Sequence, residues 1–561
     1  MPGLPGKLLI HTCPQWAEER KDMKNSLGKY AAEQKSARTS TPQTQKTPGR
    51  TDEVKNNAGG FTFEVSPKTR LERFLILGTD KGTYYVGERK FTEDNVKFVR
   101  DLIRKDERMV VDTIVDVSSN GRAAKNSPAL FVMALVMAEG QDKAYARAAV
   151  QKVARTSTHL FEYAQYIDDL GGWGRAKRQS VADWYESKDA GSLAYQAVKY
   201  RQRNGWTHRD LFRLSHPKGV DQRVGTFILK GSNPETVGGD IIDGFAKMQK
   251  ATSVKQVLDI LEENPRLPWE TIPTQFLKDA KVWQVLFYQG ALGQTALLRN
   301  VKRFAKMGAF DDMMFAGEVA KRLADAEAIR KGRVHPVSYL NALYIYTKGE
   351  FARTGWSGAR SKDWNTNAKV AGALEAGFYN AFGNVQPANK RTMVSIDVSA
   401  SMTWQAPAGL VGLDCREAAA AMAMVLVRSE PYVTVNAFST SLQDAGVSDS
   451  DSLQTVMNKI SRLPMGGTDC AQPMLYATKN NIAVDTFTVW TDNETWAGRV
   501  KPFQALKQYR DKTGIDARLV VVGLEGNEFT IADPTDKGML DVVGFDANAP
   551  GVIADFSAGR V

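Results

Sequence analysis

The stretch Thr392-Met393-Val394-Ser395-Ile396-Asp397-Val398-Ser399-Ala400-Ser401 decides the fold of the C-terminal part of the chain. Its first five residues include the β-branched and apolar side chains that are typical of a buried strand, and Asp397 follows them directly. If this strand is parallel, Asp397 lies at its carboxyl end, where open α/β sheets bind their ligands. The stretch therefore predicts an α/β domain with a ligand site at that edge of the sheet.

Two later segments supply further oxygen ligands at the same edge. The apolar run Thr486–Trp490 ends just before Asp492, and Gly466-Gly467 precedes Thr468 in a loop whose backbone can approach an ion closely. A hard divalent cation prefers the hydroxyl and carboxylate oxygens that these segments offer. The predicted ligands are Asp397, Ser399, Ser401, Thr468 and Asp492. We therefore predict a metal site that binds rather than catalyses, and whose residual positive charge accepts an acidic ligand from a partner protein.

The motif Asp-x-Ser-x-Ser alone has another interpretation, since an aspartate can also cap a helix through a Ser-rich turn. Three segments in order, each beside a strand or a Gly turn, favour the metal site. These residues closely resemble the metal-ion-dependent adhesion site of von Willebrand factor A domains. That resemblance implies that the five ligands hold an ion, usually Mg²⁺, directly or through water.

Strands and helices alternate along residues 363–561. The segments with strand character are Thr392–Ile396, Val433–Phe438, Thr486–Trp490 and Arg518–Val522, and those with helix character are Val370–Phe382, Cys415–Arg428, Ser452–Ser461, Ala471–Lys479 and Pro502–Arg510. This order predicts a doubly wound, mostly parallel α/β sheet.

Residues 61–362 have the pattern of successive helices separated by Gly, Pro, Ser or Asp. The predicted helices are Glu93–Arg104, Glu107–Val117, Pro128–Ala138, Asp142–Ala154, Ser157–Leu170, Val181–Glu186, Leu193–Arg203, Val254–Leu261, Ala291–Lys306, Glu318–Ala326 and Pro336–Tyr346. Helices of similar length without comparable strands indicate a helical-repeat array, although a helical bundle stays possible because no repeat consensus is visible.

Length and composition limit the remaining possibilities. The chain has 561 residues, which favours several domains, and a formal net charge of +11, which makes a polyanionic partner plausible. It contains neither an apolar stretch long enough to cross a bilayer nor a signal peptide, so we expect a cytoplasmic protein. We also expect the protein to be a monomer. Residues 1–60 are basic and poor in apolar residues, so we expect them to be disordered.

The segment from Lys199 to Lys218 is dense in hydrogen-bond donors. The predicted helix would place Lys199 and Arg203 on one face, where they repel each other unless an anion lies nearby. Arg209 and His216 add further donors that suit phosphate groups. The alternative is a solvated basic face that is paired with acidic residues of neighbouring helices.

This segment and several others resemble the TROVE module of Ro ribonucleoprotein autoantigens and their bacterial counterparts. The matching segments include Gly171–Arg175, Phe74–Gly78, Gly82–Tyr85, Thr295–Asn300, Arg333–Pro336 and Phe529–Pro534. The resemblance covers nearly everything after the N-terminal extension. It implies a multidomain α and α/β protein, in which a ring of HEAT-like helical repeats is closed by a von Willebrand factor A domain.

The same resemblance implies a function. In the Ro family, small noncoding Y RNAs bind a basic outer surface, and single-stranded ends of misfolded RNAs enter the central hole. Lys199, Arg203 and His216 match positions implicated in Y RNA binding, and the matching block also contains Arg201, Gln202, Asn204, His208 and Arg209. Bacterial relatives can be tethered by Y RNA to an exoribonuclease, so we expect a role in RNA quality control or decay.

Two other classes of protein compete with this interpretation. An enzyme is disfavoured because the chain has five His and lacks the phosphate-binding loop, zinc-protease and nucleophile-elbow motifs. A metal-dependent protein-adhesion scaffold, whose helical array has no RNA role, is the remaining alternative, since the metal site alone would permit it.

Overall fold

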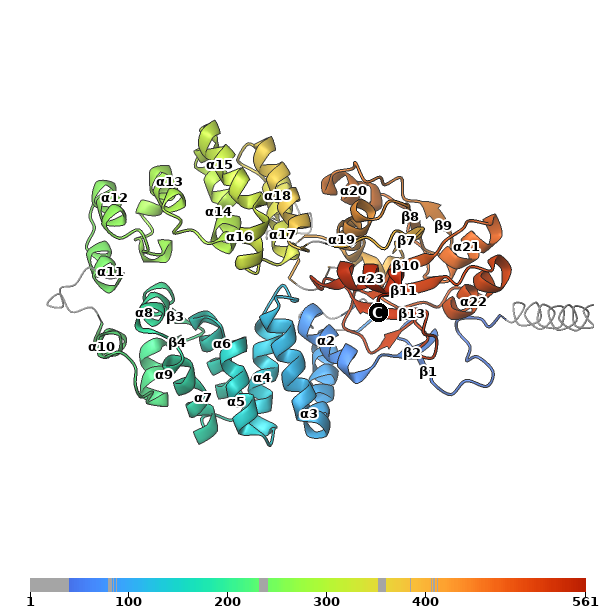
Figure 1. Cartoon of the computed structure of the whole chain (residues 1–561), viewed down its shortest axis with the longest axis horizontal. Coiled ribbons are helices and arrows are strands. Elements are labelled where there is room, and N and C mark those ends of the chain that lie inside the picture. Colours follow the sequence, from blue (N-terminus) through green and yellow to red (C-terminus); the bar gives the residue numbers. More distant parts are fainter. Residues whose placement is uncertain are drawn as a thin grey trace, which may run out of the picture.

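The computed structural model describes residues 40–561 except 79–82, 84, 87, 232–240, 352–359, 384, 405, 407–408 and 411. Residues 1–39, which make up most of the predicted disordered extension, lie outside the described residues. The chain forms a curved array of helices and an α/β domain (Figure 1). The array runs from α2 to α18, and both of its ends meet the α/β domain, so the chain forms a ring.

The α/β domain contains a six-stranded sheet in the order β13-β11-β10-β7-β8-β9. Its strands are β7 (Thr392–Asp397), β8 (Val433–Phe438), β9 (Leu442–Asp444), β10 (Thr486–Thr491), β11 (Arg518–Gly523) and β13 (Met539–Val543). All neighbouring strands are parallel except β9, which pairs antiparallel with β8. The strand after β7 in the chain, β8, lies on one side of β7, and the later strand β10 lies on its other side. The carboxyl ends of β7 and β10 therefore lie at the topological switch point, where such sheets bind ligands.

Helices cover both faces of this sheet. They are α19 (Cys415–Ser429), α20 (Leu453–Ile460), α21 (Gln472–Asn480), α22 (Pro502–Thr513) and α23 (Ala549–Ala558). Within β7, Met393 belongs to the core shared with α21 and α22, whereas Val394 and Ile396 belong to the core shared with α19. Because both faces are buried, the strands have continuous apolar runs instead of alternating patterns. The four strands predicted from the sequence are confirmed.

The helical arc consists of short helices that pack side by side (Figure 1). Its α-helices are α2 (Pro67–Leu77), α3 (Glu88–Ser119), α4 (Ser127–Glu139), α5 (Lys143–Val153), α6 (Ser157–Asp169), α7 (Arg175–Glu186), α8 (Ala190–Lys199), α9 (His208–Ser215), α10 (Gln222–Lys230), α11 (Ile241–Gln249), α12 (Val254–Glu263), α13 (Ala280–Tyr288), α14 (Gln294–Lys306), α15 (Met313–Ala324), α16 (Ala326–Lys331), α17 (Pro336–Lys348) and α18 (Ala368–Asn380). Pro128 and Pro336 lie in the first turns of α4 and α17, where a missing N–H costs no hydrogen bond.

One predicted helix boundary in this arc is wrong, and one predicted break between helices is confirmed. The predicted helices Glu93–Arg104 and Glu107–Val117 are two helical parts of α3, separated by the non-helical residue Asp106 (φ −153°, ψ 74°). The predicted helix Leu193–Arg203 ends at Lys199, and a hairpin of β3 (Gln202–Arg203) and β4 (Trp206–Thr207) follows. Asn204 and Gly205 form its turn with φ values of 51° and 79°, a conformation that Asn and Gly adopt readily. Lys199 and Arg203 therefore do not share a helical face.

Two predicted domain boundaries also need correction. α18 packs against α15 and α17 and so completes the helical arc, although the sequence assigned it to the α/β domain. Residues 40–64 are ordered, although residues 1–60 were predicted to be disordered: β1 (Glu53–Lys55) and β2 (Phe61–Glu64) form a sheet with β12 (Phe529–Thr530). The reason is that this segment buries Phe63 and several polar side chains against the α/β domain.

Contacts from both ends of the arc close the ring. At the N-terminal end, Arg122 forms an ion pair with Asp546 at 2.7 Å, and its backbone carbonyl contacts the imidazole of His335 at 3.0 Å. His335 caps α17 near the C-terminal end. Tyr344 of α17 donates its hydroxyl hydrogen to the carbonyl of Gly412 in the α/β domain at 2.6 Å. Among the described helices, none combines the length and apolarity that crossing a membrane requires.

Candidate functional site

The structure brings the predicted metal ligands to one edge of the sheet. Asp397 ends β7, and its carboxylate accepts hydrogen bonds from the backbone N–H of Ser399 at 2.8 Å and the hydroxyl of Thr491 at 2.7 Å. The hydroxyl oxygens of Ser399 and Ser401 lie 3.2 Å apart. The five side chains Asp397, Ser399, Ser401, Thr468 and Asp492 are between 0% and 2% exposed. The site therefore lies just below the protein surface.

The electrostatics of this edge favour a bound cation. Burial and the neighbouring charge of Asp492 raise the pKa of Asp397 to about 7, and burial also raises the pKa of Asp492. One carboxylate oxygen of Asp492 is buried without a hydrogen-bond partner. A dication bound between the two carboxylates would compensate for their desolvation and satisfy this oxygen. The donor set of two carboxylates and three hydroxyls also fits a hard cation such as Mg²⁺.

Sequence reasoning missed several residues that support this site. Thr491, the last residue of β10, orients Asp397 through the hydrogen bond given above. Gln43 and Asn57 contact the loops that carry Thr468 and Asp492, although they lie in the predicted disordered extension. Local sequence patterns give no signal for Gln43 and Asn57, because their partners lie more than 400 positions away.

The predicted basic residues surround the β3–β4 hairpin and α9. Arg201, Gln202, Arg203, Asn204, Arg209 and His216 are all exposed. No ion pair involves Arg201, Arg203 or Arg209 within the part of the chain that the structure describes, so the alternative of a face paired with acidic neighbours does not hold for them. Lys199 is mostly buried instead. Its ammonium group lies 5.4 Å and 5.2 Å from the ring centres of Tyr195 and Tyr200 and 3.9 Å from a carboxylate oxygen of Glu270.

His208 is a core residue and not a surface donor. Its side chain is buried, its Nδ1 lies 2.9 Å from the hydroxyl of Tyr185, and its ring packs on Phe161. Burial lowers its pKa to about 4, so the imidazole is neutral at pH 7. His208 therefore lies mostly in the core, at the base of the cavity that Arg201 and Arg209 also line, and its contact with RNA stays a prediction.

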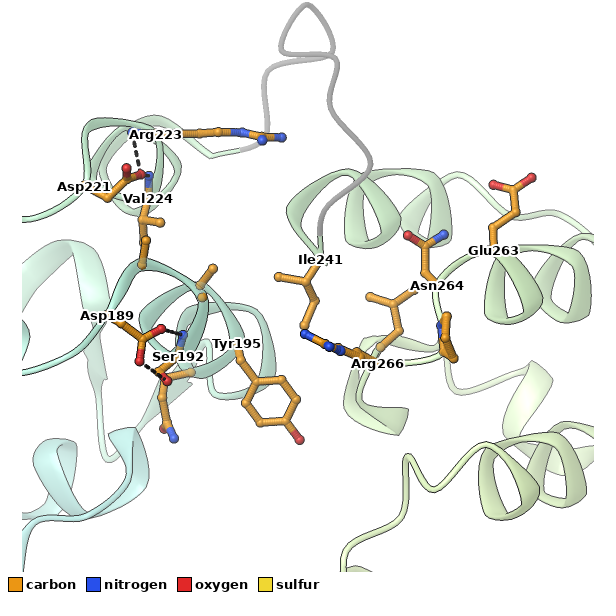
Figure 2. A pocket seen from close by; sticks show the side chains of 16 residues that line it. Asp189, Ser192, Tyr195, Asp221, Arg223, Val224, Ile241, Glu263, Asn264 and Arg266 are labelled. Carbon is orange, nitrogen blue, oxygen red and sulfur yellow. Dashed lines mark hydrogen bonds between the residues drawn. The ribbon is translucent and has the colours of Figure 1, made fainter.

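Two cavities flank α8. One, of about 720 Å³, is lined by Arg201, Gln202, Arg209 and the aromatic side chains of Phe227 and Phe245. Figure 2 shows the other, of about 920 Å³, where Tyr195 and Arg266 face the space between α8 and the segment around α11 and α12. This second cavity also contains the carboxylates of Asp189, Asp221 and Glu263. The first cavity contains one carboxylate, that of Asp210, against three in the second, so the first suits a polyanion better.

A further basic cluster lies where the arc meets the α/β domain. Lys125, Arg299 and Lys302 line a cavity of about 340 Å³ between α14, α17 and Gly409. Arg299 is exposed on α14. No local sequence pattern marks these three residues as a cluster, because they come from separate elements.

Comparison with known proteins identifies the family. The TROVE domain matches residues 54–247 and 263–350, and the Ro60 vWA domain matches residues 391–557. The chain belongs to the Ro60 family. The RNA-binding protein RO60 of Deinococcus radiodurans is 41% identical over 531 residues, which cover 93% of this chain and 98% of the relative. The RNA-binding protein RO60 of Caenorhabditis elegans is 32% identical over 593 residues and covers 91% and 90%, respectively.

A solved structure supports the same assignment. The crystal structure of the Deinococcus radiodurans RO (RSR) protein has a TM-score of 0.65 to this chain at 40% sequence identity, covering 88% of this chain and 100% of that one. The identity to Deinococcus RO60 shows a bacterial-type Ro60 protein, as the sequence predicted. The pairing of a helical ring with a von Willebrand factor A domain is thus confirmed.

Proposed function

We propose that this protein binds RNA through the exposed face of the β3–β4 hairpin and α9. The observation that carries the proposal is the group of exposed cations Arg201, Arg203 and Arg209, which form no ion pair with any residue that the structure describes, with His216 near the end of α9. Unpaired guanidinium groups on one surface suit the phosphates of a folded RNA, whose deep major groove excludes side chains. Two relatives named as RNA-binding proteins support the proposal.

The RNA class that suits this surface best is a small noncoding RNA of the Y or Y-like type. The cluster of Lys125, Arg299 and Lys302 supports a second role, in which the ring interior receives the single-stranded end of a misfolded RNA. A single strand needs cations along its backbone and little sequence readout. Together, these two surfaces suit RNA quality control or decay, with an exoribonuclease tethered through the RNA.

A binding experiment with a matched control tests the proposal. The triple variant Arg201→Ala, Arg203→Ala, Arg209→Ala removes three cations, and Lys255→Ala, Lys321→Ala, Lys369→Ala removes three exposed cations from other helices. Gel-shift titrations with a stem–loop RNA should show strong weakening only for the first variant. The slope of log affinity against log salt concentration should also indicate about two to three fewer released counterions for this first variant than for the original protein. Equal affinities of both variants would contradict the assignment.

We also propose that Asp397, Ser399, Ser401, Thr468 and Asp492 hold Mg²⁺. The ion would accept an external carboxylate as a further ligand. The site would then bind a partner and would not catalyse a reaction. A specific observation favours a protein ligand here. Each of the three loops carries one exposed apolar side chain: Trp404 is 43% exposed, Met465 58% and Trp496 41%. These loops contain no Lys or Arg between residues 399–404, 464–470 and 491–498, so apart from the ion they offer no cation to a polyanionic RNA. Their exposed apolar side chains suit a protein segment that brings a single carboxylate to the ion.

A further inference from the structure

Gln43 joins the two loops that carry Thr468 and Asp492. Its side chain is fully buried, and its Nε2 donates to a carboxylate oxygen of Asp469 at 2.7 Å and to the carbonyl of Val500 at 2.8 Å. Its Oε1 accepts a hydrogen bond from the hydroxyl of Thr495. Asp469 directly follows Thr468, and Thr495 lies three residues after Asp492. One buried amide thus connects both ligand loops.

The loop after Asp492 receives further hydrogen bonds from the same N-terminal segment. The Nδ2 of Asn56 donates to the carbonyl of Thr495 at 2.9 Å. The carboxylate of Glu494 accepts from the Nδ2 of Asn57 at 2.8 Å and from the backbone N–H of Ala58 at 2.9 Å. The backbone and side chains that follow the ligand are therefore held by residues 56–58.

This segment is tightly docked and leads directly into the ring. A buried ion pair at 2.7 Å joins Glu53 to Lys501, and β2 pairs with β12. At Gly60, a Cβ atom would lie 1.8 Å from the carbonyl oxygen of Thr495, so the backbones approach as closely as only glycine permits. Two residues after β2, Ser66 caps α2, the first helix of the arc. The segment is thus covalently continuous with the helical arc and hydrogen-bonded to the ligand loops.

The ligand loops need such support. Thr468 follows two glycines, which leave its loop little intrinsic rigidity, and both loops lie outside the strands of the sheet. Metal affinity depends on outer groups that fix the positions of the ligands. A buried amide whose donor and acceptor are both engaged specifies one arrangement of its partners, because any displacement leaves a polar atom unsatisfied.

We infer that Gln43 and Asn57 are positioning residues for the divalent-cation site, and that docking of residues 40–64 and cation binding favour each other. This inference rests on the proposed function of Asp397 and Asp492 as cation ligands. The coupling is reciprocal by thermodynamic necessity: a docked segment raises cation affinity, and the cation stabilises the docked segment. The proposed RNA-binding residues of the β3–β4 hairpin are not part of this coupling.

Titration of the full chain with Mg²⁺ tests the inference. Isothermal titration calorimetry should show Kd values for Gln43→Ala and Asn57→Ala that are about 10-fold or more above that of the unchanged protein. The control is Gln294→Ala, which removes another buried amide, whose Nε2 donates to the carbonyl of Arg322 at 2.8 Å in the helical arc, outside the segment. This variant should lower the melting temperature and leave the Mg²⁺ Kd within twofold. Asn57 is exposed, so its variant should fold even where Gln43→Ala does not.

Limited trypsin digestion gives a second readout at Lys46 and Lys55, which are exposed within the segment. Mg²⁺ should slow cleavage at these sites in the unchanged protein and have no effect in Asp397→Ala. Binding of Mg²⁺ to the unchanged protein but not to Asp397→Ala would support the metal site. If the variants Gln43→Ala and Asn57→Ala then bind Mg²⁺ as tightly as the unchanged protein, the inference is overturned while the metal site stands. Absence of Mg²⁺ binding in the unchanged protein would overturn both.

Discussion

At the scale of single residues, Asp397 is the central side chain of the proposed cation site at the sheet edge. It is fully buried beside a second carboxylate, and its carboxylate is held by Ser399 and Thr491. The sequence predicted this residue and its four co-ligands because each directly follows a strand or a Gly turn. It did not predict Thr491 as a supporting group, because a threonine inside an apolar strand has no distinguishing pattern.

The variant Asp397→Ala should lose Mg²⁺ binding in a calorimetric titration, because one of only two carboxylate ligands is removed. RNA affinity, measured by gel shift, should stay within about twofold, since the hairpin lies on the other part of the molecule. Circular dichroism should confirm that the variant is folded. Loss of RNA binding in a folded variant would show that the α/β domain shapes the RNA surface.

The raised pKa of Asp397, about 7, predicts a pH-dependent cation affinity. Below pH 7 the carboxyl group of the cation-free protein is protonated, so a proton must leave before Mg²⁺ binds. Because the folded-state pKa is above the unfolded value, the cation-free protein loses stability as pH rises through 7. The increase in melting temperature caused by Mg²⁺ should therefore be larger at pH 8 than at pH 6, and equal increases would contradict this assignment.

At the scale of elements, the N-terminal segment shows where sequence reasoning fails. Its composition is polar and basic, which predicted disorder, yet Gln43 and Glu53 are buried against residues 469 and 501. Strands and helices with their own apolar patterns were predicted well. The short strands β1, β9, β12 and β13 and the β3–β4 hairpin were missed, because strands of two to five residues carry little apolar pattern and the hairpin lies where a helix was predicted.

Truncation separates the ordered part of this segment from the rest. Removal of residues 1–60 should lower the melting temperature by several degrees, because it exposes the partners of Gln43 and leaves Lys501 without Glu53. Removal of residues 1–39 is the control and should leave the melting temperature nearly unchanged. Differential scanning calorimetry provides the measurement, and equal effects of both truncations would contradict the docking described above.

At the scale of the whole molecule, the ring presents two basic surfaces that should be separable. The double variant Arg299→Ala, Lys302→Ala removes two cations from the cavity beside α14. It should weaken binding of a stem–loop RNA with a single-stranded end more than binding of the same stem–loop with a blunt end. The control Lys255→Ala, Lys321→Ala should affect neither RNA, and an equal loss for both RNAs in the first variant would mean that the cavity does not select free ends.

The ring closes through residues that are synthesised far apart in time. Asn57 contacts Glu494 across 437 positions, and Arg122 contacts Asp546 across 424. A nascent chain on the ribosome therefore carries its helical arc as an open crescent until translation is almost complete. If the ring interior binds RNA as proposed, a transcript without free ends would have lateral access to the inner wall during that interval, and the closed ring would exclude it once the last strand has been made.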